Sequence, residues 1–536
     1  MVDQKKVQEV LDTIPLRYRG TGGAIAIIKD GELIGQRAWG YADIDQRLPL
    51  TPDIQMPICS ITKQFVCALL LDLQRNPTPS MLAKGDIQAQ FDDKLRELLR
   101  PELTQDGTLT VQNLCDMQSG LRDYWAMTAL WGTKPEDEYL VERDCPPMLE
   151  RTKSFHFKPG SEFSYCNVNF YVLARVIERT TGEPLGKLLS ERILGPAGMK
   201  TAFLCPDNAK LPPPCLGYEG TEALGFVPAV NKMEWSGDAG LVASLTDMIA
   251  WEKHLQHLYS DSESWYHKVA QPITYSDGTF APYHNGLSHS DISGVDNLGH
   301  AGALRGYRSS RRHALKEGLS VVVLFNHEPD VMGASEDALR IILDKPKPQY
   351  AHVEPNASWF GSFLDQDTQL SITISKGSAP GDINVLYHDS PDTLHLTDAT
   401  HAEASGISAT IDGDVLRMHR ILENRKVEAK RLVPRESSFK DKLILGDYKS
   451  EEIESVFHCW GESGMLYGAF DGYLGKGTIT GMKYLGDDVW ALTCPRGLDA
   501  PAPGDWTIVF HREESGGIIG FKAGCWLARG IDFIKV

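Results

Sequence analysis

Lysine and proline alternate at Lys345-Pro346-Lys347-Pro348, and this segment divides the 536-residue chain into two parts with different hydrophobic patterns. Proline disfavours helix and extends the chain, so the segment has the composition of a linker. Before it, several stretches repeat apolar residues at helical spacing. After it, apolar and polar residues alternate, as around Leu370, Ile372 and Ile374, which is typical of half-buried strands. We therefore expect a mixed helix and strand unit followed by antiparallel β structure.

The second part of the chain contains a further break. A fresh apolar run begins near residue 443, and from there the chain combines short strands with many glycines, aromatic residues and turns such as Gly486-Asp487-Asp488. This composition is typical of antiparallel barrels or sandwiches. We therefore expect three domains, at residues 1–345, 346–436 and 437–536, the last two all-β.

The first domain carries signals for both strands and helices. Residues 22–43 form two apolar runs around Asp30-Gly31, a strong signal for a β-hairpin. Residues 319–325 are rich in β-branched residues, as in a central strand, and residues 336–343 are expected to form a closing helix. A short amphipathic helix is expected at 92–99, after a polar loop. The expected fold class is multidomain α+β.

Charge and cysteine usage limit the partners and the compartment. With 54 basic and 72 acidic residues, the net charge of −18 argues against nucleic acid or an anionic membrane surface as a partner. No uninterrupted apolar run approaches the roughly 20 residues of a membrane span, and no signal peptide is recognisable at the N-terminus. Ten cysteines without any Cys-x-x-Cys are expected to be reduced, so we expect a cytoplasmic protein. No metal-ligand spacing stands out, and neither a metal nor a cofactor is expected.

The first candidate for chemistry is Ser60-Ile61-Thr62-Lys63. In a helix that begins near Pro57, Ser60 and Lys63 lie on one face, one turn apart. A nearby amine is one means of activating a hydroxyl as a nucleophile. Ser-x-x-Lys is the nucleophile motif of serine β-lactamases and penicillin-binding proteins. The same spacing occurs at Ser437 and Lys440 by chance, so the motif alone decides little.

Tyr165-Cys166-Asn167, after a Pro-Gly turn, supplies a candidate base and an amide. Between cations, the phenol of Tyr165 is expected to lose its proton more readily and to act as general base, with Lys63 keeping it charged or passing the proton. Asn167 is expected to hold Lys63 or the substrate amide.

His300-Ala301-Gly302 precedes the expected central strand, and Gly302 would let a strand backbone approach the substrate closely. The backbone N–H groups of Ser60 and Ala303 are candidates for an oxyanion hole. Both spacings recur at residues 283–286, and a lone histidine near glycines is more often a loop or core residue. The order of the three motifs along the chain is what favours a catalytic interpretation.

Together these motifs resemble the serine β-lactamase-like superfamily of class C enzymes, esterases and DD-peptidases. The resemblance covers residues 10 to 345 and is carried by residues 110–121, 157–167, 195–199 and 300–307. It implies an antiparallel sheet flanked by helices. Within the superfamily, the chain length and the two appended β domains resemble the D-aminopeptidases, and residues 489–501 are similar to theirs. That family implies two antiparallel β-barrels after the catalytic domain, and a homodimer.

Carried over by motif, Ser60 is the nucleophile, and Lys63 and Tyr165 are the acid/base pair. His300 stands where class C β-lactamases have a lysine, which disfavours binding of a substrate carboxylate. The chain departs from the usual pattern at Cys59 and Cys166, both conservative in size.

An aminopeptidase must recognise the free N-terminal amine of a small peptide or amide. In D-aminopeptidases a loop of the last barrel reaches into the catalytic cleft. The best candidate for that loop is Pro495 to Gly504, with Asp499 as the anion for the substrate ammonium. The alternative is that Asp499 is a solvated turn residue.

The resemblance implies a serine hydrolase that forms an acyl-enzyme on Ser60 and releases N-terminal D-amino acids from short peptides, amides or esters. A carboxylesterase or a DD-peptidase of the same superfamily is an open alternative. A non-catalytic binding protein on this scaffold is the alternative from another class, and the presence of Ser60, Lys63 and Tyr165 together argues against it.

Overall fold

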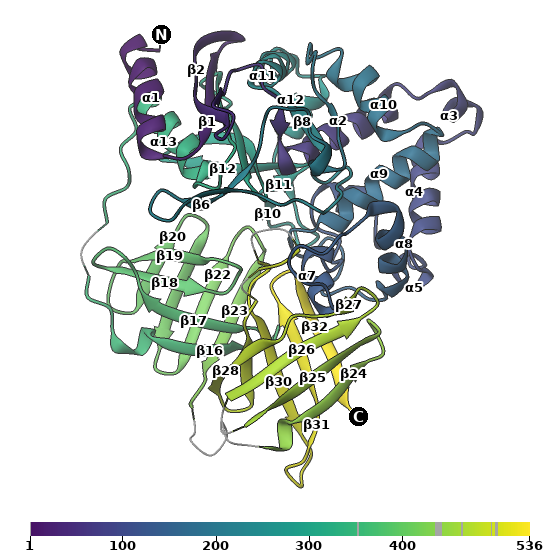
Figure 1. Ribbon diagram of the computed structural model, residues 1–536, viewed down its shortest axis with the longest axis vertical. Coiled ribbons are helices and arrows are strands. Elements are labelled where there is room, and N and C mark those ends of the chain that lie inside the picture. The colour runs from purple at the N-terminus through teal and green to yellow at the C-terminus, as the bar shows by residue number, and fades with distance from the viewer. Residues whose placement is uncertain (1, 351–352, 435–441, 463–464, 495, 499–501) are drawn as a thin grey trace.

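The computed structural model describes residues 2–350, 353–434, 442–462, 465–494, 496–498 and 502–536. Figure 1 shows a first unit of sheet and helices, a first barrel in green, and a second barrel that runs from light green to yellow. Within this described part of the chain, no helix is both long enough and apolar enough to cross a membrane.

The first unit is built on an eight-stranded antiparallel sheet in the order β11-β12-β13-β14-β15-β1-β2-β3. The central strand β15 is buried along its whole length, and Asp30 and Gly31 both have positive φ in the β1–β2 turn, so the sequence predictions of this strand and hairpin are confirmed. The strands are β1 (Gly22–Lys29), β2 (Glu32–Asp43), β3 (Leu48–Pro49), β11 (Tyr283–His284), β12 (Leu287–Ile292), β13 (Val295–Leu304), β14 (Tyr307–Ala314) and β15 (Leu319–Phe325).

Helices cover both faces of this sheet. On one face, α1 (Gln4–Arg17) and α13 (Val331–Leu343) pack on Ile25 and Ile27 of β1. On the other face, Ala24, Ala26 and Ile28 join the larger core with α11 (Leu245–Tyr259), α2 (Thr62–Arg75) and α9 (Asn167–Thr181). Successive residues of a strand point to opposite faces, so one buried apolar strand contributes to both cores.

The segment after α2 differs from the sequence prediction. The helix expected at 92–99 begins at Ile87, and the preceding polar segment contains α3. Thr78 and Asp86 are the reason, because the side chain of each accepts a backbone N–H from the first turn that follows it. The remaining helices of the unit are α3 (Pro79–Ala83), α4 (Ile87–Leu98), α5 (Pro101–Thr104), α6 (Val111–Cys115), α7 (Tyr124–Leu130), α8 (Val141–Arg151), α10 (Leu185–Leu189), η2 (Ser190–Leu194), η3 (Asn208–Lys210) and α12 (Trp265–Val269).

Short strands complete the first unit. A three-stranded sheet orders them β4-β8-β5, and two hairpins pair β6 with β7 and β9 with β10. Their bounds are β4 (Met56–Pro57), β5 (Phe203–Leu204), β6 (Tyr218–Thr221), β7 (Gly225–Pro228), β8 (Leu241–Ala243), β9 (Ile273–Thr274) and β10 (Phe280–Ala281).

The first barrel closes from β16 to β23 and encloses its own apolar core. Ile372 and Ile374 point into that core, as their alternation with polar residues predicted. Its elements are η4 (Ala357–Trp359), β16 (Gly361–Asp365), β17 (Ser371–Lys376), β18 (Asp382–Leu386), β19 (Pro391–Leu396), β20 (His401–Ala404), β21 (Ile407–Asp412), β22 (Val415–Arg420) and β23 (Arg425–Arg431).

The second barrel follows the order β25-β24-β32-β31-β30-β29-β28-β26, and the pairing of β25 with β26 closes it. Its core is continuous with the larger core of the first unit. Its elements are η5 (Lys442–Ile444), β24 (Gly446–Ser450), β25 (Ser455–Glu462), β26 (Met465–Gly472), β27 (Gly475–Lys476), β28 (Thr480–Gly486), β29 (Val489–Leu492), β30 (Trp506–Arg512), β31 (Ile518–Cys525) and β32 (Ala528–Lys535).

Glu162 of the first unit lies where all three parts meet. Its carboxylate accepts hydrogen bonds at 2.9 and 3.0 Å from Arg425 of the first barrel, and at 2.9 Å from Arg529 of the second. The side chains of both arginines are almost completely buried. The barrels are therefore joined to the segment that leads to Tyr165.

Candidate active site

The turn that carries Ser60 differs from the expected first turn of a helix. Pro57 ends β4, where it pairs with Val242, and Ser60 lies in a 3-10 turn, η1 (Cys59–Ile61), just before α2. Cys59 has a φ of +54°, which is outside the helical region and prevents α2 from extending back to Pro57. The hydroxyl is thus presented at the entry to the helix, one turn before Lys63.

The backbone at Cys59 is strained, and Gly302 makes room for it. A β-carbon on Gly302 would lie 2.6 Å from Cβ of Cys59 and 2.8 Å from the carbonyl oxygen of Ile58. The strand β13 therefore passes directly against the turn that carries the nucleophile. The sequence predicted that Gly302 permits a close approach to the substrate, whereas the contact in the structure is with this turn.

Lys63 is completely buried, and its Nζ lies 3.0 Å from Oγ of Ser60. The same nitrogen donates to Oδ1 of Asn167 at 2.9 Å and to the backbone oxygen of Asp238 at 2.8 Å. The last two partners are carbonyl oxygens, which only accept hydrogen bonds. When Lys63 is neutral, its two N–H groups point to those oxygens and its lone pair is left facing Ser60.

The environment of Lys63 favours this neutral form. Burial lowers the pKa of Lys63 to about 8, although the charges of Asp238 and Asp123 oppose the shift. A far larger share of this amine than of an ordinary lysine, on the order of a tenth, is therefore unprotonated at pH 7. A buried lysine with a lowered pKa next to a hydroxyl is a candidate general base.

Tyr165 lies beside Ser60 and Lys63, but its pKa differs from the one that the sequence predicted. Nζ of Lys63 lies 4.9 Å from the centre of its ring, and its hydroxyl is hydrogen-bonded to Ser60. Burial raises the pKa of Tyr165 well above its usual value, and the charges of Asp123 and Asp238 raise it further. The prediction that neighbouring cations lower this pKa was wrong, because burial of the phenol raises it and the charges of two carboxylates act on it as well. The resting phenol is protonated and able to donate.

His300 is neutral in this environment. Its Nδ1 lies against the backbone oxygen of Ala301 and must donate to it, so Nε2 accepts the hydrogen bond from the hydroxyl of Tyr283 at 2.9 Å. Burial lowers the pKa of His300 to about 3, and the charge of Lys63 acts in the same direction. Its ring centre lies 6.4 Å from that of Tyr165. A neutral His300 offers no charge to a substrate carboxylate.

Ala303 and Asp499 are the other two residues that the sequence predicted for the site. Ala303 continues β13 and pairs across the sheet with Arg308, next to the glycine that touches the nucleophile turn. Asp499, the candidate for the substrate ammonium, lies outside the described residues, as do Pro495, Ala500 and Pro501.

The structure adds carboxylates that the sequence reasoning missed. Asp123 and Asp238 are both buried, and both carry charge close to Lys63. The hydroxyl of Tyr124 donates to Asp238, whose other oxygen accepts from the backbone of Ser236 at 2.7 Å. An aspartate immediately before the apolar helix α7 is a helix N-cap signal, which was available for Asp123. No local signal distinguished Asp238.

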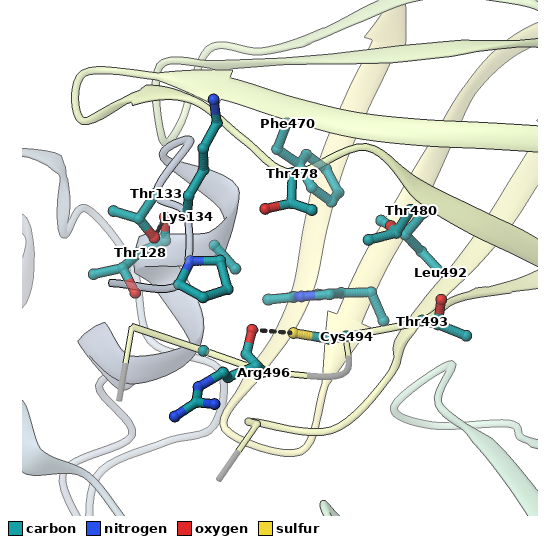
Figure 2. A pocket seen from close by; sticks show the side chains of 14 residues that line it. Thr128, Thr133, Lys134, Phe470, Thr478, Thr480, Leu492, Thr493, Cys494 and Arg496 are labelled. Atoms are coloured by element: carbon teal, nitrogen blue, oxygen red, sulfur yellow. Dashed lines mark hydrogen bonds between the residues drawn. The ribbon is translucent and has the colours of Figure 1, made fainter. Parts of the chain in front are cut away.

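Figure 2 shows a pocket between the C-terminal end of α7 and the rim of the second barrel. Thr128, Thr133 and Lys134 line one side, and residues of the barrel such as Phe470 and Leu492 line the other. None of the predicted site residues that the structure describes lines this pocket. Among the described residues there is also no group of three or more metal-ligating side chains that would hold an ion.

Two family models match the chain. One, described as Beta-lactamase, covers residues 4–344, and one described as D-aminopeptidase, domain B, covers residues 352–534. A D-aminopeptidase of Brucella anthropi is 41% identical over 534 residues, which is 100% of this chain and 99% of that protein. One of Brucella canis is 40% identical over 535 residues, with the same coverage. An octameric penicillin-binding protein homologue from Pyrococcus abyssi shares the fold, with a TM-score of 0.54 and 19% identity over 80% of this chain and 100% of that one.

Proposed function

This chain belongs to the family of D-aminopeptidases built on the β-lactamase fold, and from that membership we propose that it is a serine hydrolase that releases N-terminal D-amino acids. Its substrates are short peptides, amides or esters with a free N-terminal amine. The observation that carries the assignment of residues is the 3.0 Å contact of Lys63 with Ser60. When the amine is neutral, its bonds to Asn167 and to the backbone of Asp238 leave its lone pair to face the hydroxyl.

Acylation begins with Ser60. Neutral Lys63 takes the hydroxyl proton as Oγ attacks the substrate carbonyl carbon, and a tetrahedral oxyanion forms. The N–H groups of Ser60 and Ala303 stabilise that oxyanion, where each donor contributes about 2.7–4 kcal/mol in comparable enzymes. The raised pKa of Tyr165 suits a proton donor, so its phenol protonates the leaving amine as the C–N bond breaks and then regains a proton from Lys63.

Deacylation uses the same groups in reverse. A water molecule gives a proton to Lys63 and attacks the ester carbon of the acyl-enzyme. The second tetrahedral intermediate collapses, Oγ of Ser60 regains its proton, and the amino acid leaves as product. Each turnover consumes one water and restores every proton position. Two-product, ping-pong kinetics follow from this order.

The substrate ammonium needs an anion, and Asp499 is our proposal for it. Support comes from the described neighbours of this residue in the same loop. Arg496 forms an ion pair with Glu219 of β6 in the first unit, and Leu498 is buried in the larger core. The loop after β29 therefore runs along the first unit, which contains Ser60.

A pair of chiral substrates tests the function. We expect release of p-nitroaniline from D-alanine p-nitroanilide, little from the L form, and none from either by the Ser60→Ala variant. If the enzyme cleaves simple esters but neither of the two anilides, the result would favour a carboxylesterase. No turnover and no labelling of Ser60 by an acylating probe would favour a binding protein.

We also propose the setting of the enzyme. None of the ten cysteines, all of which are described, forms a disulfide, which supports a reducing compartment such as the cytoplasm. The family resemblance supports a homodimer, and light scattering on purified protein tests it. For the domains we propose residues 1–345, 346–436 and 437–536; the second boundary falls at residues outside the described part of the chain.

A further inference from the structure

We propose that Asp123 is a positioning residue for the reaction, which acts through Asn167 to keep the amine of Lys63 aimed at Ser60. The proposal rests on the proposed function, because it assigns Asp123 to the same acylation step. Asp123 reaches Ser60 through Asn167 and Lys63, and it is not a catalytic residue in this scheme.

The carboxylate of Asp123 joins two helices. It is the N-cap of α7, where Oδ1 accepts the backbone N–H of Trp125 at 3.1 Å. Oδ2 accepts the backbone N–H of Asn167 at 3.1 Å, and Asn167 is the first residue of α9. Cys166, the N-cap residue of α9, makes no side-chain cap bond. Asp123 therefore satisfies an N-terminal donor of both helices and places its negative charge at their positive ends.

The same oxygen fixes the orientation of the Asn167 amide. Nδ2 of Asn167 donates to Oδ2 of Asp123 at 2.9 Å, so Oδ1 is the end that faces Lys63, also at 2.9 Å. With the amide reversed, an N–H group would face Lys63. Two N–H donors would then meet, and the geometry that leaves the lone pair facing Ser60 would be lost.

The second barrel holds the backbone of this segment. The N–H of Asp123 donates to the carbonyl oxygen of Leu527, in the turn between β31 and β32, at 3.0 Å. Its neighbour Arg122 donates through Nε to the oxygen of Arg529 at 3.0 Å and pairs with Glu452 at 2.8 Å. Figure 1 shows α7 at the top of this barrel. One hydrogen-bonded path thus runs from the barrel backbone to the nucleophile.

The charge of Asp123 also acts on Lys63. Burial raises the pKa of Asp123 to about 6, whereas the N–H groups of Trp125 and Asn167 lower it, so the carboxylate is ionised at neutral pH. A negative charge near an ammonium group stabilises the protonated amine. Removing that charge should therefore lower the pKa of Lys63. The other titratable groups that face Lys63 are Ser60, Tyr165, His300, Asp238, Cys59, Cys166 and Cys67.

The test is Asp123→Asn in the full chain, measured by the rate at which a fluorophosphonate labels Ser60 across a pH series. This probe carries no titrating group, so its pH dependence reports the enzyme. Two backbone N–H groups and the Asn167 amide donate to the two carboxylate oxygens of Asp123, whereas an asparagine there would offer them a single acceptor oxygen. We expect the plateau rate to fall about tenfold to a hundredfold, and the acid limb to move about 1 pH unit lower.

The matched control is Asp247→Asn, which removes another buried N-terminal carboxylate, that of the capping box of α11. It should lose comparable thermal stability and keep the acid limb of the native protein. If Asp123→Asn slows labelling no more than this control and leaves the limb unmoved, the residue is only structural and the inference is wrong. If the native protein is not labelled at Ser60, the proposed function is wrong, and this inference, which rests on it, is wrong as well.

Discussion

Nζ of Lys63 lies 3.0 Å from Oγ of Ser60, and burial lowers the pKa of that amine to about 8. A base acts only when unprotonated, so activity should rise with pH and level off above the pKa. We predict that the rate of Ser60 labelling by a fluorophosphonate has an acid limb with a midpoint near pH 8. A pH series with stopped samples, quantified by mass spectrometry, gives that midpoint.

Substitution of Lys63, the proposed base, should remove both the activity and the acid limb of its pH profile. Lys63→Arg keeps a cation that does not lose its proton in proteins, so labelling is expected to fall at least a hundredfold at every pH. Lys158→Arg, at an exposed position, is the control and should behave as the native enzyme. A midpoint below pH 6 in the native enzyme would assign the proton to another group.

Tyr165 is predicted to matter most when the leaving group needs a proton. Its raised pKa keeps the phenol protonated, and an anilide leaves as an amine that must be protonated, whereas a p-nitrophenolate leaves without a proton. We expect Tyr165→Phe to slow hydrolysis of D-alanine p-nitroanilide by about 10²–10⁴-fold and of the matching p-nitrophenyl ester by less than tenfold.

The control for this comparison is Tyr171→Phe, which removes the hydroxyl of a buried tyrosine on α9, the helix that begins two residues after Tyr165. Its two rates should stay close to those of the native enzyme. Equal losses on anilide and ester in Tyr165→Phe would contradict the role of proton donor, because they would show that the phenol acts on the nucleophile.

Local patterns in the sequence predicted much of this fold. The Asp30-Gly31 hairpin, the strand at 319–325 and the alternating strands after the linker depend on residues close together in the chain, and the structure confirms them. The helix boundary at Ser60 was wrong because Pro57 pairs with a strand, β8, that lies far along the chain. Tertiary pairing overrode the local helix signal.

The site shows the same division. The motifs identified Ser60, Lys63 and Tyr165 as candidates, and the structure brings these three side chains together. The protonation of Tyr165 was mispredicted because it depends first on the burial of the phenol and then on the charges of Asp123 and Asp238, which come from two distant segments. Burial and charges that act through space depend on the folded structure, so the spacing of residues along the chain does not predict their effect on a pKa.

Gly302 provides a test of packing at the nucleophile turn. A β-carbon there would lie 2.6 Å from both Cβ of Cys59 and Oγ of Ser309, so either β13 or the turn must move. We predict that Gly302→Ala lowers the free energy of unfolding by about 1–3 kcal/mol and the turnover of D-alanine p-nitroanilide by about a hundredfold. Urea denaturation and steady-state kinetics measure both.

The control is Gly481→Ala on β28, where an added β-carbon meets nothing within 4 Å. It should change neither the stability nor the turnover measurably. Normal turnover in Gly302→Ala would show that the turn tolerates displacement, and the close approach would then have no bearing on catalysis.

Glu162 is predicted to couple the barrels to the first unit. Its carboxylate accepts from Arg425 and Arg529, and Glu162→Gln would take the counter-charge from buried Arg529, whereas Arg425 would keep its pairs with Asp365 and Asp367. We expect a loss of about 3 kcal/mol in the free energy of unfolding, seen by urea denaturation, and a fall in kcat because the segment leading to Tyr165 is released. Glu183→Gln, which breaks an exposed pair with Lys187, is the control and should change neither quantity. If Glu162→Gln is as stable and active as that control, the barrels are held by their apolar contacts alone.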